Sequence, residues 1–323
     1  MIRTFQALWI GLLVLCTLGA CAPLQGAGGP RASETLAHVD VSPTLSWWDK
    51  AGDPLLARLI DDGLAADARL RREAQALAAQ QARTRQWQYR VVQWVARTLH
   101  EAPQPTDALA LRLQESRLRK AARIARAYVD VRSLQSRLAL RQAFQDQFHD
   151  DADLARWRHE AGLVSGVDNG LAATLVGVNA SALGTTRTRL AEATAALARR
   201  TGLASARLEL MLDDGARVPR LAWPAAPAPC HAAVVDPAGL AGVERDAERT
   251  ARDARAAYQL GTGDFATLYV AQTAVVHARE ASVAEATRQA RAAVDAWTDH
   301  ALRLLHGEAQ RGAASAQHGA CDG

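Results

Sequence analysis

The chain has 323 residues, enough for one large domain or two ordinary ones, and 49% of them are hydrophobic although only 5% are aromatic. Alanine, leucine and valine therefore make up much of the apolar content, which favours close helix packing over a bulky globular core. The formal net charge is +4, with basic and acidic residues interspersed along the sequence. This spacing is typical of solvated helix faces and argues against a nucleic-acid-binding protein.

The first residues have the form of a secretory signal. An arginine at position 3 precedes an apolar run over residues 5–18, which is too short to predict a membrane-spanning helix. Residues 18–21, Leu-Gly-Ala-Cys, resemble a bacterial lipobox, in which the cysteine is lipidated and becomes the first residue of the mature chain. We therefore expect residues 1–20 to be a lipoprotein signal peptide and Cys21 to carry the lipid. Ordinary cleavage beside an incidental cysteine is the alternative.

The rest of the chain divides by composition and periodicity into five parts. We expect a flexible tether over 21–46, a first helical repeat over 47–201, a Pro/Gly-rich linker over 202–239, a second, truncated helical repeat over 240–306 and a disordered tail over 307–323. Two cysteines outside the signal, Cys230 and Cys321, either pair or stay free, and their spacing does not decide between these states.

Local signals place the helices within the repeats. Asp53 is a good N-cap and Pro54 suits a first helical turn, so a helix is expected from there to about residue 100. A second helix starts near Thr106 and a third follows to about residue 201, while a fourth and a fifth occupy the second repeat. Alternating residues at 87–95 and 108–114 leave a short β-hairpin as an alternative there.

Two breaks between these helices resemble one another. The segments EAGLVSGVDNGLAATL and YQLGTGDFATLYVAQ each contain two glycines and an aspartate between long helices. The matched residues are Gly162 with Gly261, Gly166 with Gly263, and Asp168 with Asp264. The repetition predicts two antiparallel helical hairpins with their turns at the same end. The second segment is no phosphate loop, because no strand precedes it and no Gly-Lys-Ser/Thr run follows.

No catalytic residue, cofactor or metal site is predicted. His149 and Asp153 have helical metal-ligand spacing, but His159 lies on a different face, so a solvated helix surface is the interpretation. The sequence offers no Ser-His-Asp or nucleophilic-cysteine context, and long helices offer no concave apolar pocket. A non-enzymatic protein is expected.

Several segments together resemble the TolC-like outer-membrane efflux proteins, in particular their lipoprotein branch. They are the lipobox at Cys21, the opening WWDKAGDPLLARLIDDGLAADARLRREAQALAAQQAR, and the segments ARAYVDVRSLQSRLAL, AGLVSGVD and YQLGTGDFATLYVAQ. In that family a tyrosine, a glycine three residues later and a Leu-Asp-Ala-Gln-like segment recur. This chain has Tyr258, Gly261 and a segment ending at Gln272, with Val270 in place of the usual aspartate.

The resemblance implies a homotrimer in the outer membrane. Each chain of the family contributes two helical repeats to a periplasmic α-barrel and four strands to a membrane β-barrel. The six matched turn residues would shape the periplasmic tips, which form the exit gate and meet a periplasmic adaptor that links to an inner-membrane pump. The implied function is export of small molecules, with the protein anchored by lipid on the periplasmic face of the outer membrane.

This chain departs from the family in length. Only about six residues connect the first two helices where a strand hairpin belongs, and residues 202–258 are shorter than the corresponding family segment. The expected fold is therefore all-α dominated, with long antiparallel hairpins and with β-barrel strands largely absent or reduced. A non-channel helical periplasmic lipoprotein scaffold, derived by loss of the strands, is the alternative function.

Overall fold

Helices form all the regular structure in the part of the chain that the computed structural model describes, residues 45–85, 105–213, 215, 217–224 and 237–318. No β-strand occurs in these ranges, which confirms the all-α expectation. The elements in order are η1 (Trp47–Lys50), α3 (Pro54–Ala66), α4 (Ala68–Arg85), α6 (Pro105–Glu160), α7 (Gly166–Thr201), α8 (Ser205–Leu212), α9 (Pro237–Leu260) and α10 (Phe265–His318).

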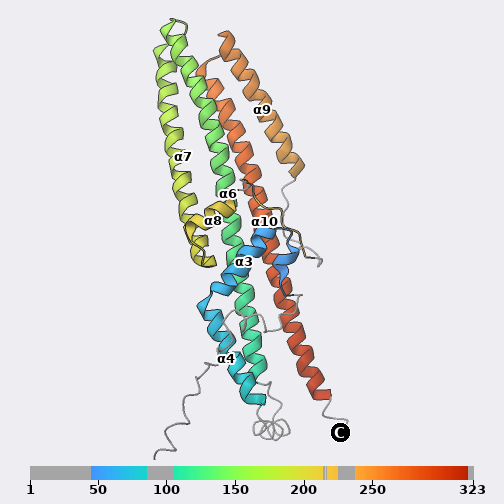
Figure 1. The fold of residues 1–323 in the computed structure, drawn as a ribbon. Helices are drawn as coiled ribbons and strands as arrows, with labels where there is room; N and C mark the ends of the chain where they lie inside the picture. Colours follow the sequence, from blue (N-terminus) through green and yellow to red (C-terminus); the bar gives the residue numbers. More distant parts are fainter. Residues whose placement is uncertain (1–44, 86–104, 214, 216, 225–236, 319–323) are drawn as a thin grey trace, which may run out of the picture.

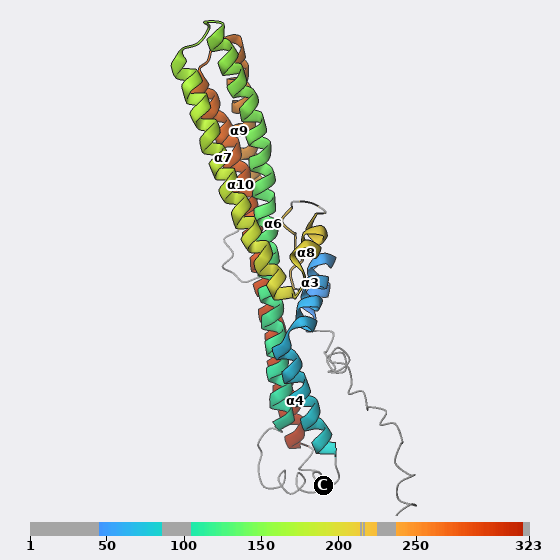
Figure 2. The same ribbon diagram turned by 60° about the vertical axis from the view of Figure 1, so that its left-hand side comes forward.

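The four long helices form one layer built from two antiparallel hairpins. α6 and α7 form the first hairpin, α9 and α10 form the second, and α6 packs against α10, giving the order α7–α6–α10–α9. Figure 1 shows both hairpin turns at the top of the molecule, and Figure 2 shows the same layer turned by 60°. α6 has 56 residues and α10 has 54. At a rise of 1.5 Å per residue each helix is about 80 Å long.

The helix boundaries differ from the expected ones in three places. The first helix is interrupted at Asp67, whose extended backbone ends α3 and whose Oδ1 accepts hydrogen bonds from the N–H groups of Arg69 and Leu70, at 2.9 and 3.2 Å, to begin α4. The Pro/Gly-rich linker contains the short helix α8. The tail expected to be disordered from residue 307 continues as helix to His318, because its many alanines favour α10.

A lateral belt covers one side of α6 and α10 at mid-height. It consists of residues 45–66, 205–213, 215 and 217–224. The N–H of Ala222 donates to the Ala51 carbonyl at 2.9 Å, and the Ala222 carbonyl accepts from Trp297 Nε1 at 2.6 Å. On α6, Arg132 Nη1 donates to the Leu212 and Gly215 carbonyls at 2.9 and 2.7 Å. These bonds fasten the belt to both central helices.

The start of α3 is fixed to α6 through Asp53. Its Oδ1 caps α3 by accepting from the Leu56 N–H at 2.9 Å, as predicted, and its Oδ2 accepts from the Tyr128 hydroxyl at 2.9 Å. Burial raises the pKa of Tyr128 to about 12, so this hydroxyl stays a donor at neutral pH. Trp47 and Trp48 are 0% and 3% exposed, so these two aromatics pack inside the belt.

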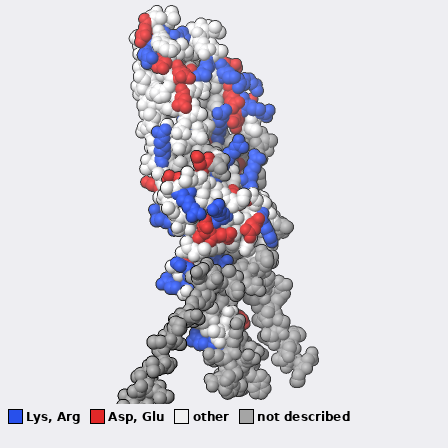
Figure 3. Space-filling model, viewed as in Figure 1, with Lys and Arg blue, Asp and Glu red and all other residues white. Residues whose placement is uncertain are grey.

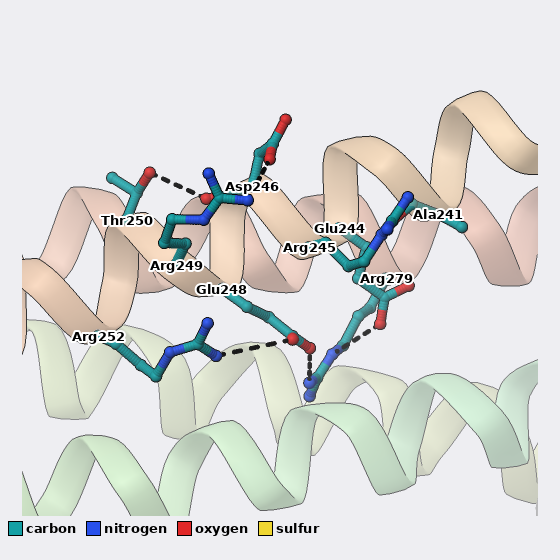
Figure 4. A network of polar contacts seen from close by, with 9 residues as sticks. All are labelled: Ala241, Glu244, Arg245, Asp246, Glu248, Arg249, Thr250, Arg252 and Arg279. Carbon is teal, nitrogen blue, oxygen red and sulfur yellow. Dashed lines mark hydrogen bonds and ion pairs between the residues drawn. The ribbon is translucent and has the colours of Figure 1, made fainter.

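Ion pairs tie the long helices to one another along their length. Arg279 of α10 bonds both Glu244 and Glu248 of α9 (Figure 4). Between α6 and α10, Arg126 pairs with Asp295 and Arg291 with Asp130. The surface in Figure 3 shows basic and acidic residues interspersed, as the sequence predicted.

Several predicted features fall outside the described residues. These are the signal peptide and Cys21, most of the tether, the candidate strand at 87–95, Cys230 and Cys321. The other candidate strand, 108–114, belongs to α6, so no hairpin forms from it. None of the helices in the described ranges combines the length and the apolar content that a membrane crossing requires.

Candidate functional site: the paired helix turns

The first turn ends α6 in a Schellman motif. Gly162 has a φ of +73°, a left-handed conformation that favours glycine. Its N–H donates to the His159 carbonyl at 2.9 Å, and the N–H of Leu163 donates to the Arg158 carbonyl at 2.8 Å. These two bonds satisfy carbonyls that the end of a helix otherwise leaves without partners.

The start of α7 is capped by Ser165. Its side chain accepts a hydrogen bond from the backbone N–H of Asp168 at 3.4 Å. Gly166 is the first residue of α7 and has no positive φ. A Cβ built on Gly166 would lie 3.6 Å from His159 Cε1, an ordinary van der Waals contact. The position therefore has room for a side chain.

The second turn ends α9 in the same way. Gly261 has a φ of +81°, its N–H donates to the Tyr258 carbonyl at 3.1 Å, and the Thr262 N–H donates to the Ala257 carbonyl at 3.0 Å. Gly263 also donates to the Ala257 carbonyl, at 3.1 Å. The repeated motif explains why both breaks contain a glycine at this point.

Asp264 caps α10. Its Oδ1 accepts from the Thr267 N–H at 2.7 Å. This bond is the first cause of a lowered pKa at Asp264, since it stabilises the carboxylate. Asp168 has a different position, because it follows the cap of α7 rather than forming it. The sequence match thus identifies equivalent residues at Gly162 and Gly261 but not at the two aspartates.

Arg158 joins the two turns. This residue lies in the last turn of α6, and its Nη1 donates to the Tyr258 carbonyl at the end of α9. Its guanidinium carbon lies 4.7 Å from the centroid of the Tyr258 ring, a cation–π contact. The two turns are therefore bonded directly to each other.

A small apolar core, distinct from the belt, lies beneath both turns. Tyr258, Phe148, Phe265 and Leu268 are each 0% exposed in it. Phe148 contacts Phe265 with a centroid separation of 5.7 Å, and Phe265 contacts Tyr258 at 5.8 Å. Burial raises the pKa of Tyr258. Because α6, α9 and α10 all contribute rings, this core holds the two hairpin ends together.

A buried polar cluster lies next to this core. Asp151 of α6 is 3% exposed and accepts from Arg255 of α9, with Nη2 to Oδ1 at 2.7 Å and Nε to Oδ1 at 2.9 Å. Its other oxygen, Oδ2, accepts from the side-chain amide of Gln272 of α10. One carboxylate therefore connects three helices, and Gln272 is the glutamine of the motif that the sequence singled out.

The surface of the turns exposes large apolar side chains. Leu163 is 68% exposed, Val167 is 77% and Leu260 is 80%, with Trp157 and Val270 also exposed further along the helices. Scattered apolar residues are normal on a surface, but several close to the same turns are typical of a contact with another protein. The sequence identified the turn residues but not this apolar surface.

The segment that the sequence offered for metal binding lies within α6. No group of three or more His, Cys, Asp and Glu side chains there is arranged to share a metal ion. In the segment HDDADLARWRHE, His149 and Asp153 have metal-ligand spacing, but the residue that matters to the packing is Asp151. It occupies the apolar series Phe148, Asp151, Ala155 at three- and four-residue steps, a signal that points to a buried carboxylate.

Among the solved structures that resemble this one are the outer-membrane channel OprN, a membrane protein from Pseudomonas aeruginosa and the outer membrane protein VceC from Vibrio cholerae. Their TM-scores are 0.58, 0.56 and 0.57, with 13%, 16% and 12% sequence identity. The alignments cover 79%, 79% and 80% of this chain and 91%, 95% and 98% of those chains.

No protein-family model matches the sequence, and neither does any curated protein. At these identities the likeness establishes the fold. The described helices have the fold of outer-membrane channel proteins.

Proposed function

We propose that this chain is a TolC-like outer-membrane lipoprotein that acts as a conduit component for the export of small molecules. It would work with a periplasmic adaptor and an inner-membrane pump, with Cys21 as the lipid anchor. The observation that carries the proposal is the pair of bonded turns at one end of a four-helix layer that has the fold of outer-membrane channels.

The open edges of the layer support assembly from several copies, and we propose a homotrimer. α7 and α9 are the edge helices, so each has a side that no other described helix covers. On α7, a Cβ built at Gly170, Gly177 or Gly184 has nothing within 4 Å. The seven-residue spacing places these glycines on one outward face, where a neighbouring helix can approach closely.

The exposed apolar residues of the turns support adaptor binding at this end. Leu163, Val167 and Leu260 project from the two turns that Arg158 joins. Burial of such side chains against an apolar partner contributes about 1.5–3 kcal/mol each. In this proposal the turns lie at the periplasmic end, and docking there opens the gate, with the energy supplied by the pump.

The test is planar-bilayer conductance of the purified full chain, combined with its mass in detergent by light scattering. We expect a trimer with stable single-channel conductance. Gly177→Trp, on the outer face of α7, should reduce the trimer, whereas Gly307→Trp, on the central helix α10 where a Cβ also has nothing within 4 Å, controls for general disturbance. A lipid-tethered monomer without conductance would contradict the proposal and favour the scaffold alternative.

A second test concerns the anchor and the partners. Mass spectrometry of the mature chain should find a lipidated Cys21, and Cys21→Ser should release the protein from the membrane. Leu163→Asp with Leu260→Asp should abolish co-purification with the adaptor while conductance persists. Retention of the adaptor by this double variant would place the docking surface elsewhere.

A further inference from the structure

A groove between α6 and α10 carries a positive charge that no described residue neutralises. It has a volume of about 690 Å³ and lies far from the turns, at the level of the belt. Its main polar lining comes from both central helices: Asp130, Ser133, Arg137, Thr287, Arg288 and Arg291.

The charges of the groove can be matched pair by pair. Arg291 bonds Asp130 with Nε to Oδ1 at 3.0 Å, and Arg288 pairs with Glu285 of its own helix. The remaining carboxylate of the lining, Asp295, bonds Arg126 with Nε to Oδ1 at 2.9 Å.

Arg137 remains as the unmatched cation. It has no ion pair or hydrogen bond within the described ranges, and its Nε is shielded from solvent. A cationic donor without an acceptor costs free energy, so an anion that meets the part of the Arg137 side chain lining the groove is favoured.

The floor of the groove adds hydroxyl groups. Ser133 and Thr287 are 6% and 7% exposed, and Thr287 Oγ1 donates to Ser133 Oγ at 2.9 Å. Arginine forks and hydroxyl groups are the usual partners of carboxylate and phosphate oxygens. We propose that this groove binds a small anion, a carboxylate or phosphate group, through Arg137.

The position of the groove favours a small solute over a second copy of the chain. Successive residues of a helix turn by about 100°, so positions 130, 133 and 137 lie on the side of α6 opposite to Tyr128 and Arg132, which contact the belt. The lining belongs to the two central helices, with α7 contributing only Ala193. Copies that associate through the edge helices would leave this groove open.

A role in transport rests on the proposed channel function, but the binding itself does not. If the face away from the belt lines the conduit, the groove selects anionic solutes along the path. Binding is measured on the purified full chain by equilibrium dialysis with radiolabelled inorganic phosphate. We expect saturable binding of one phosphate per chain.

Arg137→Gln should weaken phosphate binding at least tenfold, and Arg137→Lys should weaken it less, because lysine keeps the charge but loses the planar fork. Arg303→Gln is the matched control, since Arg303 is an exposed arginine of α10 without an ion pair in the described ranges, about 22 Å along the helix from Arg288. Arg137→Gln should fold normally by circular dichroism, because Arg137 has no partner to lose.

Unchanged phosphate binding in Arg137→Gln would overturn the proposal, and so would an equal loss in Arg303→Gln, which would indicate nonspecific charge attraction. If wild type bound no phosphate and Arg137→Gln had a lower oligomer mass than wild type, the proposal would also be overturned. That result would indicate that an acidic side chain of a second copy fills the groove. In bilayers, Arg137→Gln should also lower the anion preference of the reversal potential. Absence of any conductance would contradict the channel function and leave the dialysis result standing.

Discussion

Arg158 joins the ends of two hairpins by donating to the main-chain carbonyl of Tyr258 and lying over its ring, with the guanidinium carbon 4.7 Å from the ring centroid. The same carbonyl accepts the Gly261 N–H at 3.1 Å. If one turn moves away from the other, the bond from Arg158 to this carbonyl at the cap of α9 must break. The turns therefore separate only when this contact is lost.

The contact predicts that two substitutions, one in each partner, differ in their effect on stability. Arg158→Ala should loosen the turns and lower stability by about 1–2 kcal/mol, since it removes a charge-assisted hydrogen bond and a cation–π contact. Tyr258→Phe should have little effect, because the ring and carbonyl remain and the Tyr258 hydroxyl has no hydrogen-bond partner in the described ranges. Amide exchange at residues 258–262 measures the loosening. Equal exchange in Arg158→Ala and wild type would contradict this account.

Gly162 and Gly261, the two turn glycines with positive φ, allow a second comparison of stability between variants. Gly162→Ala and Gly261→Ala should each lose about 1–2 kcal/mol from the backbone conformation alone. A Cβ at Gly162 meets nothing within 4 Å, whereas a Cβ at Gly261 lies 3.2 Å from Arg158 Nη2. Gly261→Ala should therefore be the more damaging of the two in thermal unfolding, and the difference should vanish in an Arg158→Ala background.

Gly166 and Gly263, the second glycine of each turn, should differ in how substitution by alanine changes thermal stability. A Cβ at Gly263 would lie 3.2 Å from the Tyr258 nitrogen and 3.3 Å from the Ala257 carbonyl carbon, backbone atoms that cannot rotate away. Gly263→Ala should lower the melting temperature. Gly166→Ala should leave it unchanged or raise it, because alanine favours the first turn of α7. Comparable losses in both variants would show that the turns tolerate no side chain at either position.

The buried carboxylate of Asp151 predicts a large loss of stability when its charge is removed. Asp151→Asn should destabilise the protein by about 3 kcal/mol, because it leaves Arg255 without its ionic partner. Asp153→Asn is the control: Asp153 pairs with Arg156 on an exposed surface, and such pairs contribute about 0–1 kcal/mol. Urea unfolding of both variants gives the comparison. If Asp151→Asn lost less free energy of unfolding than Asp153→Asn, the central role of Asp151 would be refuted.

The cap of α10 predicts a pH dependence. The Thr267 N–H bond lowers the folded pKa of Asp264 below its ordinary value of 3.8. A lowered folded pKa contributes stability above the unfolded pKa, and this contribution is lost as the pH falls through the folded value. The Thr267 amide shift should therefore titrate with a midpoint below 3.8, and Asp264→Asn should abolish the titration while keeping a cap. A midpoint at or above 3.8 would exclude the bond.

Local rules predicted the hairpins but not the contacts between them. Glycines in the breaks and apolar residues at three- and four-residue steps determine where helices begin and end, so both turns were predictable. The contact of Arg158 with Tyr258 depends on how far α6 and α9 are shifted along each other. That shift is set by packing around Phe148 and Phe265, which no local spacing records. The break at Asp67 was also missed, because an aspartate within an apolar series is compatible with a continuous helix.

The belt has a consequence for the order in which the chain folds. Tyr128 meets Asp53 across 75 residues, and Trp297 meets Ala222 across another 75. The α6–α7 hairpin forms from neighbouring segments, whereas the belt closes only when α10 supplies Trp297, and such long-range contacts form slowly. The apolar segment around Trp47 and Ile60 is thus synthesised early, but its burial is completed only after α10 has been made. During that interval its exposed apolar side chains make it prone to aggregate.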